Sequence, residues 1–389
     1  MTIIWATILV LGVLITIHEL GHFIAARSVG IRVEKFSVGA PPRFFSVISE
    51  DNGWSIRIFF FKRINGKFIW QPVYENFLNK NNRTGSGTEY VLALLPLGGY
   101  VKMAGIIDEN MDTELKYEDD EFMSKPLWAK LWVLSAGVIM NTILAFFIFA
   151  ALAFQQGKPE INNEPIIADL QKDMPALNAG ILPGDRILKI NGNNIETWDD
   201  LTTHIQSLPE SNIDLIILRD NIEIEMNITT SKLAVPSDGL IDTIGVMGIV
   251  PEIIYHDINI INAFQIGISR TIASFGMIIM SLKMLGSGAA SMSDLGGPIM
   301  IAQLAGETAE AGWIPFLTFM ALISVNLAFL NILPIPGLDG GHIFIHLIEG
   351  IIRRPLSLKI RIIVQQVGMA FLLLLMVTII FNDIIRLFN

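Results

Sequence analysis

The stretch Thr2–Ala26, TIIWATILVLGVLITIHELGHFIAA, decides the class of fold of this 389-residue chain. It is apolar over the roughly 20 residues that a helix needs to cross a hydrocarbon core. Its ionisable residues are His18, Glu19 and His22, and such residues are costly inside a membrane. A signal peptide is the alternative, but no small-residue cleavage site follows, and the ionisable trio does not suit a signal core. The stretch predicts a first transmembrane helix, residues 1–26, that carries function.

The composition of the whole chain agrees with a membrane protein. Hydrophobic residues make up 52% of the sequence and charged residues only 16%, against roughly 25% in soluble domains. This excludes a purely soluble enzyme and a disordered chain. The net charge of −10 argues against nucleic acid as a partner. The absence of cysteine removes disulfides and thiolate zinc sites.

Three further apolar stretches have the length of a transmembrane helix. They are Leu131–Phe154, Trp313–Leu338 and Ile362–Phe381, for which we expect spans at 129–155, 313–341 and 362–384. Arg270 divides a fifth candidate, Ile258–Leu282, into two uncharged stretches of 12 residues, each too short to span. This favours an amphipathic helix on the membrane surface, residues 256–286. The expected fold is a polytopic α-helical membrane protein with four transmembrane helices.

The charges of the connecting segments orient the chain. The segment Ala25–Lys130 carries 14 Lys and Arg residues, whereas Gln155–Gly312 carries 8 against 20 Asp and Glu residues. Because basic residues near span ends mark the cytoplasmic side, the first segment is predicted to be inside and the second outside. Both termini are then extracytoplasmic.

The polar residues 163–252 are predicted to form an extracytoplasmic domain. Pro165–Leu170, Ile213–Leu218 and Glu223–Ile228 have the pattern of strands. Between the first two lies PALNAGILPGDRILKINGNNI (Pro175–Ile195), which resembles the PDZ-domain signature of a short helix, a Gly-Asp turn and a strand closing on Asn-Gly. The resemblance implies one permuted PDZ-like α+β domain, whose peptide-binding loop comes last. The residues expected in this loop are Val246, Met247, Gly248 and Ile249.

His18-Glu19-Leu20-Gly21-His22 is an H-E-x-x-H motif inside the first apolar stretch. On a helix, residues i and i+4 share a face, so both imidazoles can reach one zinc ion, and Glu19 can accept the proton of an attacking water. A third ligand is needed, and Asp339 in NILPIPGLDGG (Asn331–Gly341) is the candidate. The prolines break the helix there. If this span enters from outside, Asp339 reaches the cytoplasmic end, at the depth of His18 and His22.

These motifs together resemble the site-2 protease family of intramembrane zinc metalloproteases, in its regulator-of-sigma-E branch. TEYVLALLPLGGYVKM (Thr88–Met103) and LGGP (Leu295–Pro298) extend the resemblance over nearly the whole chain. It implies one Zn2+ held by His18, His22 and Asp339, with Glu19 as general base. It also implies substrate handling by Asn331 and matches a second-span Gly-x-x-x-Asn pattern at Gly137 and Asn141, although interhelical packing is the alternative for Asn141. The insert Ile64–Gly87 has no counterpart to which we can assign a role.

Residues 27–128 are expected to form a membrane-associated β-hairpin or re-entrant region. The run Val91–Leu97 is too short to span. The strand after it, formed by Tyr100, Val101, Lys102 and Met103, is predicted to hold an unwound substrate by β-addition. A cytoplasmic hairpin with packing duties is the alternative.

The predicted function is intramembrane hydrolysis of single-span membrane proteins in the bacterial cytoplasmic membrane. The family implies substrates such as anti-sigma factors or signal-peptide remnants, already trimmed outside by another protease. The PDZ-like domain is expected either to exclude large ectodomains or to bind the new carboxyl terminus. A non-proteolytic scaffold with a structural metal and a zinc transporter are the alternatives. An intact Glu19 argues against the scaffold, and the lack of an internal repeat argues against the transporter.

Overall fold

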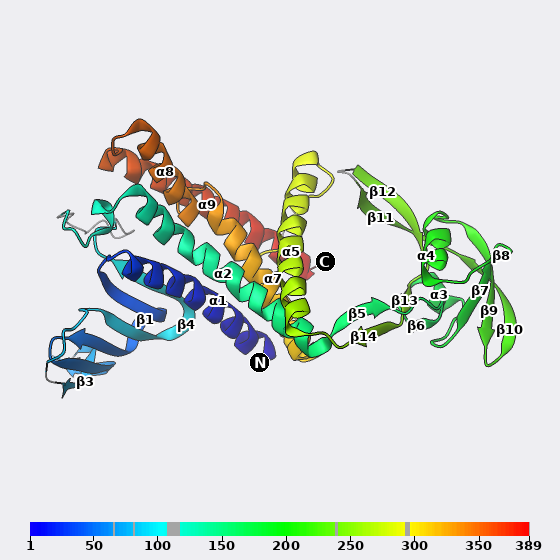
Figure 1. Cartoon of the computed structure of the whole chain (residues 1–389), viewed down its shortest axis with the longest axis horizontal. Helices are drawn as coiled ribbons and strands as arrows, with labels where there is room; N and C mark the ends of the chain where they lie inside the picture. Colours follow the sequence, from blue (N-terminus) through cyan, green and yellow to red (C-terminus); the bar gives the residue numbers. More distant parts are fainter. Residues whose placement is uncertain (65–66, 81, 107–116, 238–239, 292–295, 389) are drawn as a thin grey trace. The chain divides into compact units, whose positions relative to one another are not determined.

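The computed structural model describes residues 1–388 apart from 65–66, 81, 107–116, 238–239 and 292–295 (Figure 1). The chain forms two compact units. The first consists of Met1–Phe149, Gly267–Gly276 and Met292–Asn389, and the second of Ala150–Ile266 and Met277–Ser291. The candidate active site lies entirely in the first unit.

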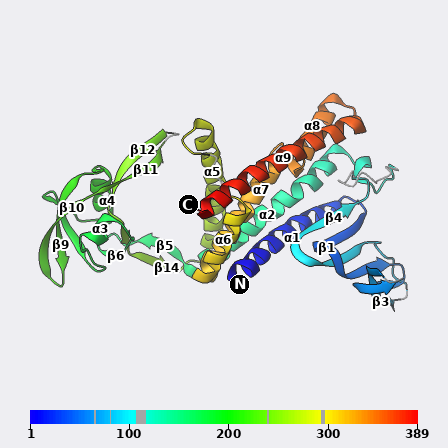
Figure 2. The ribbon, with the colours of Figure 1, turned by 180° about the vertical axis from the view of Figure 1, so that it is seen from behind.

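The first unit is built on long helices at the positions of the four predicted spans. They are α1 (Thr2–Ser28), α2 (Leu127–Gln156), α7 (Trp313–Ile332) and α9 (Leu358–Phe388). Two further helices belong to this unit (Figure 2). Along the chain, α6 (Pro298–Ala311) precedes α7, and α8 (Asp339–Ile352) stands between α7 and α9. The predicted third span therefore ends at Ile332, and Asp339 begins a new helix instead of ending the old one.

Two core clusters fix the directions of α1, α2 and α7. Near the start of α1, Val10 lies in a cluster with Phe316 of α7, and Ile148 near the end of α2 packs against it. Near the end of α1, Ala25 lies in a cluster with Val133 near the start of α2. Therefore α2 runs antiparallel to α1. The helix α7 runs parallel to α1, because Asn331 near the end of α7 lies beside His18. The end of α2 and the beginning of α7 lie at the same end of the bundle.

A four-stranded sheet has the strand order β3-β2-β1-β4, and Figure 1 shows β1 and β4 beside α1. Its strands are β1 (Val33–Glu50), β2 (Gly53–Ile64), β3 (Lys67–Asn79) and β4 (Glu89–Met103). Ser37 of β1 is in register with both Tyr100 and Val91 of β4, so β1 lies between two parts of β4. Among the described residues, the segment Tyr100–Met103 has no strand on its other side. This part of β4 is an open sheet edge.

The sheet reaches the middle of α1. A Cβ atom on Gly12 would lie 2.9 Å from the carbonyl oxygen of Pro96, so the glycine permits this close approach. A groove at this contact is lined by Leu9 and Gly12 of α1 and by Leu92 and Pro96 of β4.

The helix α5 (Ile260–Ser287) lies where the sequence predicts an amphipathic helix, at residues 256–286. Arg270 does not divide it, because all 28 residues form one continuous helix. Among the described residues, α5 is one of five helices long and apolar enough to cross a membrane, by length and composition. By length and composition α5 could therefore span a membrane, and its surface position stays a prediction. One charged side chain within a helix does not interrupt the backbone hydrogen bonds.

The second unit contains the predicted β-rich domain. The strands expected from the sequence are present as β6 (Ile167–Leu170), β9 (Asn212–Arg219) and β10 (Ile222–Thr229). The remaining elements are β5 (Lys158–Ile161), α3 (Pro175–Asn178), β7 (Arg186–Ile190), β8 (Asn193–Asn194), α4 (Trp198–Gln206), β11 (Ser231–Ser237), β12 (Leu240–Val246), β13 (Ile249–Pro251) and β14 (Ile253–His256). The main sheet has the order β10-β9-β7-β8.

An ion pair fixes the Gly-Asp turn of this domain. Asp185 is 1% exposed, and its carboxylate accepts hydrogen bonds from the Arg219 guanidinium at 2.6 and 2.7 Å. Burial alone would raise the pKa of Asp185, but the bonds from Arg219 and from the Leu182 amide lower it below its usual value. The aspartate of the signature is thus a structural residue.

The predicted peptide-binding loop joins β12 to β13. Met247 is buried in the core, and Gly248 has a φ of +80°. A Cβ atom on Gly248 would lie 2.2 Å from the Cβ of Met174. The carbonyl oxygens of Met247 and Gly248 accept hydrogen bonds from the amides of Ala176 and Gln171. The loop conformation is therefore fixed by the domain itself.

Candidate active site

The helix α1 presents His18 and His22 on one buried face, at 7% and 6% exposure. Their Nε2 atoms lie 3.2 Å apart, as the i, i+4 spacing predicts. The neighbouring helix α2 leaves room for them through Gly137. A Cβ atom there would lie 2.4 to 2.6 Å from ring atoms of His18. The glycine of the Gly-x-x-x-Asn pattern therefore provides the space that the His18 imidazole occupies.

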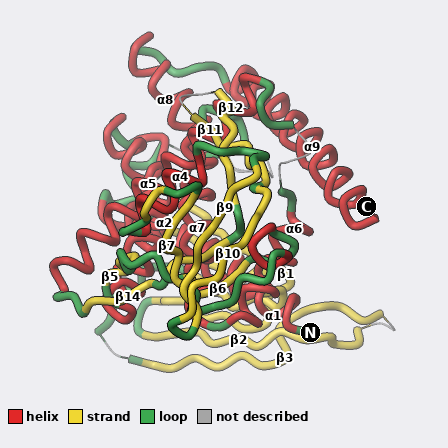
Figure 3. Tube along the Cα trace, turned by 90° about the vertical axis from the view of Figure 1, so that its right-hand side faces the viewer, coloured by secondary structure: helices red, strands yellow, loops and turns green. Residues whose placement is uncertain are grey.

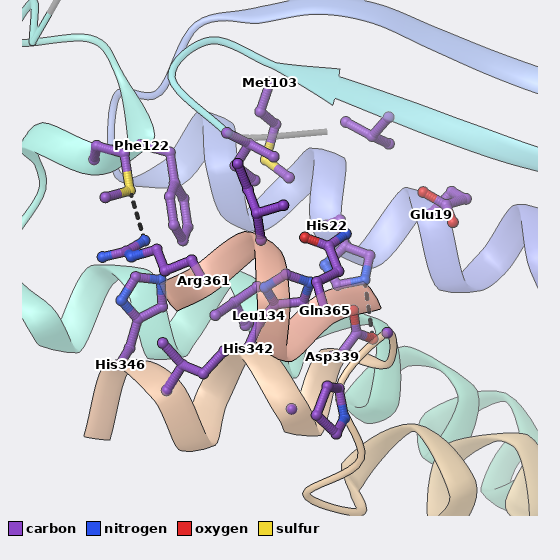
Figure 4. A pocket seen from close by; sticks show the side chains of 18 of the residues that line it. Glu19, His22, Met103, Phe122, Leu134, Asp339, His342, His346, Arg361 and Gln365 are labelled. Atoms are coloured by element: carbon purple, nitrogen blue, oxygen red, sulfur yellow. Dashed lines mark hydrogen bonds and ion pairs between the residues drawn. The ribbon is translucent and has the colours of Figure 1, made fainter. Parts of the chain in front are cut away.

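Asp339 completes the group from the first residue of α8. Its Oδ2 atom lies 3.1 Å from His18 Nε2 and 3.4 Å from His22 Nε2, and Figure 4 shows His22 and Asp339 pointing toward each other. Among the described residues, His18, His22 and Asp339 are the one group of three ionisable ligands close enough to hold a metal ion. The structure thus brings together the three ligands that the sequence predicts.

The turn between α7 and α8 explains why two glycines follow Asp339. A Cβ atom on Gly340 would lie 2.2 Å from the carbonyl oxygen of Leu333, and one on Gly341 would lie 2.4 Å from that of Ile335. Any larger residue would push the start of α8 away from the turn. The glycines therefore hold the Asp339 carboxylate against α1.

The three ligand atoms fit a zinc ion. Atoms bound tetrahedrally at about 2.0–2.1 Å from zinc are separated by roughly 3.3 Å, and the observed separations are 3.1, 3.2 and 3.4 Å. Oδ2 of Asp339 is buried and has no hydrogen bond of acceptable geometry among the described residues. A bound cation would offset the electrostatic repulsion among these three electron-rich atoms. Two imidazoles and a carboxylate are a ligand set that zinc accepts.

Hydrogen bonds on the far side of each imidazole orient it. His22 Nδ1 lies 2.8 Å from the carbonyl oxygen of Val133. Because a carbonyl only accepts, Nδ1 carries the proton and Nε2 is free to bind metal. His18 Nδ1 lies 3.4 Å from the side-chain nitrogen of Asn141, whose oxygen is buried and unpaired among the described residues. Turning the Asn141 amide over, which exchanges its oxygen and nitrogen, gives His18 the same arrangement.

Asn141 was predicted to bind substrate, and the structure gives it a different environment. It is fully buried and lies behind His18, and the backbone carbonyl oxygen of Asn141 also accepts a hydrogen bond from Ser324 of α7. Asn331 lies on the ligand side instead, with its Nδ2 atom 3.4 Å from His18 Nε2. Of the two asparagines, Asn331 is the one beside the reacting position.

Glu19 lies between the metal ligands and the sheet edge. Its carboxylate accepts a hydrogen bond from the backbone N–H of Val101. A Cβ atom on Gly99 would lie 3.6 Å from Glu19 Cγ, so β4 passes directly over this side chain. The predicted base is thereby fixed by the same strand that was predicted to hold substrate.

A cavity of about 240 Å³ opens from the metal ligands along this strand. Val101 and Met103 line it, whereas Tyr100 and Lys102 do not, because successive side chains of a strand point to opposite faces. Lys102 forms an ion pair with Glu34 at 3.0 Å. Of the four predicted strand residues, the structure therefore places two at the cavity.

The far part of the cavity has a polar cluster that the sequence analysis missed. His346 donates a hydrogen bond to Glu349, which also forms an ion pair with Arg361 of α9. Figure 4 shows His346 and Arg361 near each other in this part of the cavity. Burial and the positive charge of Arg361 lower the pKa of His346 to about 4, so this histidine is neutral at neutral pH. The cluster ties the end of α8 to the start of α9. The i, i+3 spacing of His346 and Glu349 on α8 is a signal that the sequence offers. Nothing in the sequence indicates that Arg361 of α9 joins them.

Two imidazoles, a carboxylate and an adjacent glutamate in apolar helices define a metal-dependent hydrolase whose site lies among membrane-type helices. The model of peptidase family M50 matches residues 6–69 and 77–375. The chain belongs to peptidase family M50. It is an intramembrane zinc metalloprotease.

Named relatives agree with this class. The chain is 29% identical to the zinc metalloprotease RasP of Bacillus licheniformis, with 100% of both chains covered. It is 28% identical to the regulator of sigma-W protease RasP of Bacillus subtilis, with 98% of both chains covered. A solved structure, the PDZ domain of an SdrC-like protein from Listeria monocytogenes, is similar at 17% identity and a TM-score of 0.19, covering 24% of this chain and 90% of that domain.

Proposed function

We propose that this enzyme cleaves single-span membrane proteins within or near their transmembrane segments, at the site formed by His18, His22, Asp339 and Glu19. The observation that carries the proposal is the position of this group. It is buried between α1 and α8, beside a cavity lined by a sheet edge, and α1 has the length and hydropathy of a membrane span. A peptide bond that reaches it must come from a segment in or next to the bilayer.

The protein side chains have separate tasks in the reaction. When bound, zinc supplies a Lewis acid that polarises the scissile carbonyl and acidifies water. Glu19 takes a proton from the attacking water on a carboxylate oxygen and gives it to the nitrogen of the leaving amine. The Asn331 amide lies beside the ligand atoms and orients the substrate backbone. Asn141 keeps His18 in the tautomer that leaves Nε2 free.

The edge of β4 is the proposed substrate-binding element. A helical peptide bond is shielded because its carbonyl is already hydrogen-bonded. An open edge offers free backbone groups to an unwound segment. Since Val101 binds Glu19 through its amide, a strand added to this edge would lie next to the base.

We further propose four spans, α1, α2, α7 and α9, with the second unit and both termini outside. The proposal is supported by the common end of the bundle that the C-terminal part of α2 and the N-terminal part of α7 share. The connection between them must start and finish on one side. A single crossing by α5 does not satisfy this condition. The excess of basic residues in Ala25–Lys130 supports a cytoplasmic position for the opposite end and hence for the active site.

We propose that the substrates are anti-sigma factors that cross the membrane once. One relative is named for regulating sigma-W, which favours anti-sigma factors of one span as substrates, in the cytoplasmic membrane of a bacterium. The permuted PDZ-like domain is proposed to restrict access to substrates that another protease has already trimmed outside.

Cleavage of a purified single-span substrate in proteoliposomes tests the proposed function. A chelator should abolish cleavage, and added zinc should restore it to near its starting rate. Mass spectrometry should place the cut within or beside the apolar segment of the substrate. Cleavage confined to a distant soluble segment, or cleavage that persists after all metal is removed, would contradict the proposal.

A further inference from the structure

The tip of the β2–β3 hairpin carries a cluster of exposed apolar side chains that the protease site does not use. Phe60 and Phe61 of β2 are each 56% exposed, Phe68 of β3 is 71% exposed and Ile69 is 44% exposed. We call these four residues the tip cluster. Scattered apolar residues are normal on a surface, but contiguous ones mark an interaction site.

The tip cluster is held in place and is not a loose loop. The rings of Phe60 and Phe61 lie 5.8 and 4.9 Å from the ring of Trp70. The Trp70 Nε1–H donates a hydrogen bond of 2.7 Å to the backbone carbonyl oxygen of Arg43 in β1. The aromatic rings are thus fixed on the sheet with their outer faces open. A hairpin exposed only to water would gain by turning these rings inward.

Basic residues accompany the tip cluster. The hairpin Gly53–Lys80 contains five Lys and Arg residues and one acidic residue, Glu75. Arg57 already binds that acid at 2.7 Å. Lys62 and Arg63, both exposed, directly follow the two phenylalanines. Apolar rings beside excess positive charge are complementary to the boundary of a bilayer that contains anionic lipid.

The position of the sheet brings it to a bilayer. The sheet contacts α1 in the middle of a candidate span, at Gly12 and Pro96. Leu92, Leu94 and Leu95 of β4 are about half exposed, at 48%, 50% and 48%. If α1 crosses the membrane, these half-exposed leucines lie at the depth of the lipid acyl chains. Figure 3 shows β2 and β3 continuing the same sheet outward from β1.

We propose that the tip cluster is a lipid-binding anchor, seated at the headgroup–acyl boundary of an anionic leaflet. Phe60, Phe61, Phe68 and Ile69 enter the acyl boundary, while Lys62 and Arg63 contact lipid phosphates. The anchor goes beyond the protease function, since it takes no part in hydrolysis. The match to the family model is interrupted at residues 70–76, within β3, so this hairpin departs from the pattern the family shares.

Spin labelling of the full chain tests the anchor directly. The sequence has no cysteine, so Phe68→Cys and Ile69→Cys each give one labelled position. Ile222→Cys on β10 is the matched control, because Ile222 is also apolar and 64% exposed. In vesicles of phosphatidylcholine with about 30% phosphatidylglycerol, the tip labels should collide more often with oxygen than with a water-soluble nickel chelate. The control label should show the reverse.

Charge dependence distinguishes lipid binding from contact with a second protein chain. Lys62→Glu combined with Arg63→Glu, or vesicles of phosphatidylcholine alone, should raise nickel access at both tip positions several-fold. Tip labels as accessible to nickel as the Ile222 label, in both kinds of vesicle, would overturn the proposal. So would strong dipolar coupling between labels of two chains, because it would show that a second copy covers the cluster. These readouts do not depend on cleavage, so the anchor and the proposed function can fail separately.

Discussion

At the scale of single residues, Gly137 tests how tightly the active site is packed. Gly137→Ala places a Cβ where the structure has 2.4 to 2.6 Å to the His18 ring. The ring must move, and His18 then no longer points its Nε2 atom at the other ligands. We expect zinc affinity to fall by at least about tenfold, the scale seen when a ligand loses its orienting contacts. Zinc titration of the purified variant measures this.

Gly276→Ala is the control for that variant. It makes the same change in a helix, but nothing lies within 4 Å of the added Cβ. Zinc affinity should be unchanged. Equal zinc binding by the Gly137→Ala and Gly276→Ala variants would show that α2 does not constrain His18.

The metal ligands were predictable at this scale because chemistry and spacing both restrict them. H-E-x-x-H places two imidazoles on one helix face, and Asp339 was the acid at a break in an apolar segment. Residues that act across helices were not predictable in the same way. The partner of His18 on α2, Asn141, was assigned to substrate, and the ion pair between Glu349 of α8 and Arg361 of α9 was missed. One sequence does not state which faces of two helices meet.

At the scale of elements, the β4 edge is tested by changing the substrate. An added strand uses alternate backbone N–H groups to bind the edge. N-methylation of the substrate at those positions should slow cleavage by about 2- to 10-fold each, equivalent to one lost hydrogen bond of about 0.5–1.5 kcal/mol. Methylation at the positions between them should have little effect. Cleavage rates of a methylated substrate series therefore should alternate with period two.

A series without alternation would contradict β-addition. A proline in the enzyme strand, as in Val101→Pro, would be a less specific test of β-addition, because the Val101 amide also binds Glu19. Proline there would disturb the base as well as the edge, and the two effects could not be separated.

The helices and strands of this chain were predictable where a single pattern of hydrophobic residues, a long apolar run or a strict alternation, dominates the segment. The apolar runs of α1, α2, α7 and α9 and the strands β6, β9 and β10 of the second unit were found from the sequence. The amphipathic helix α8 and the short helix α6 were missed. The β2–β3 hairpin was left as an unassigned insert, although Asn65-Gly66 between two apolar runs is a strong hairpin signal. Whether α5 spans the membrane or lies on its surface cannot be read from the sequence, because its length and hydropathy permit a span whereas Arg270 favours the surface.

At the scale of the whole molecule, the four-span proposal predicts where the ends of α5 lie. Ile260→Cys and Ser287→Cys should both react with a membrane-impermeant maleimide applied from outside intact cells. Both ends then lie on one side, as the shared end of α2 and α7 requires. Labelling of one end only from outside, and of the other only after lysis, would show a fifth span.

Deletion of residues 163–252, with a flexible linker in their place, tests whether the PDZ-like domain restricts the access of substrates to the active site. If this domain excludes large ectodomains, the variant should cleave untrimmed substrate at a rate within about threefold of that for trimmed substrate. A soluble peptide with the carboxyl terminus of trimmed substrate should not inhibit the intact enzyme. Inhibition by that peptide would instead support binding of the terminus. The variant Gly248→Trp cannot serve to block the predicted peptide-binding loop without disturbing the domain. The Met174 side chain already occupies the space that a side chain at position 248 would need.

The most direct test of the division of roles compares zinc content and cleavage in Glu19→Gln and Asp339→Asn. Glu19 is assigned as base and Asp339 as ligand, so the first variant should retain about one zinc per chain, since all three ligands remain. It should lose cleavage by at least about 100-fold, the scale of a missing general base. Asp339→Asn should lose most of its zinc. Equal zinc loss in both variants, or an active Glu19→Gln enzyme, would contradict the assignment on which the mechanism rests.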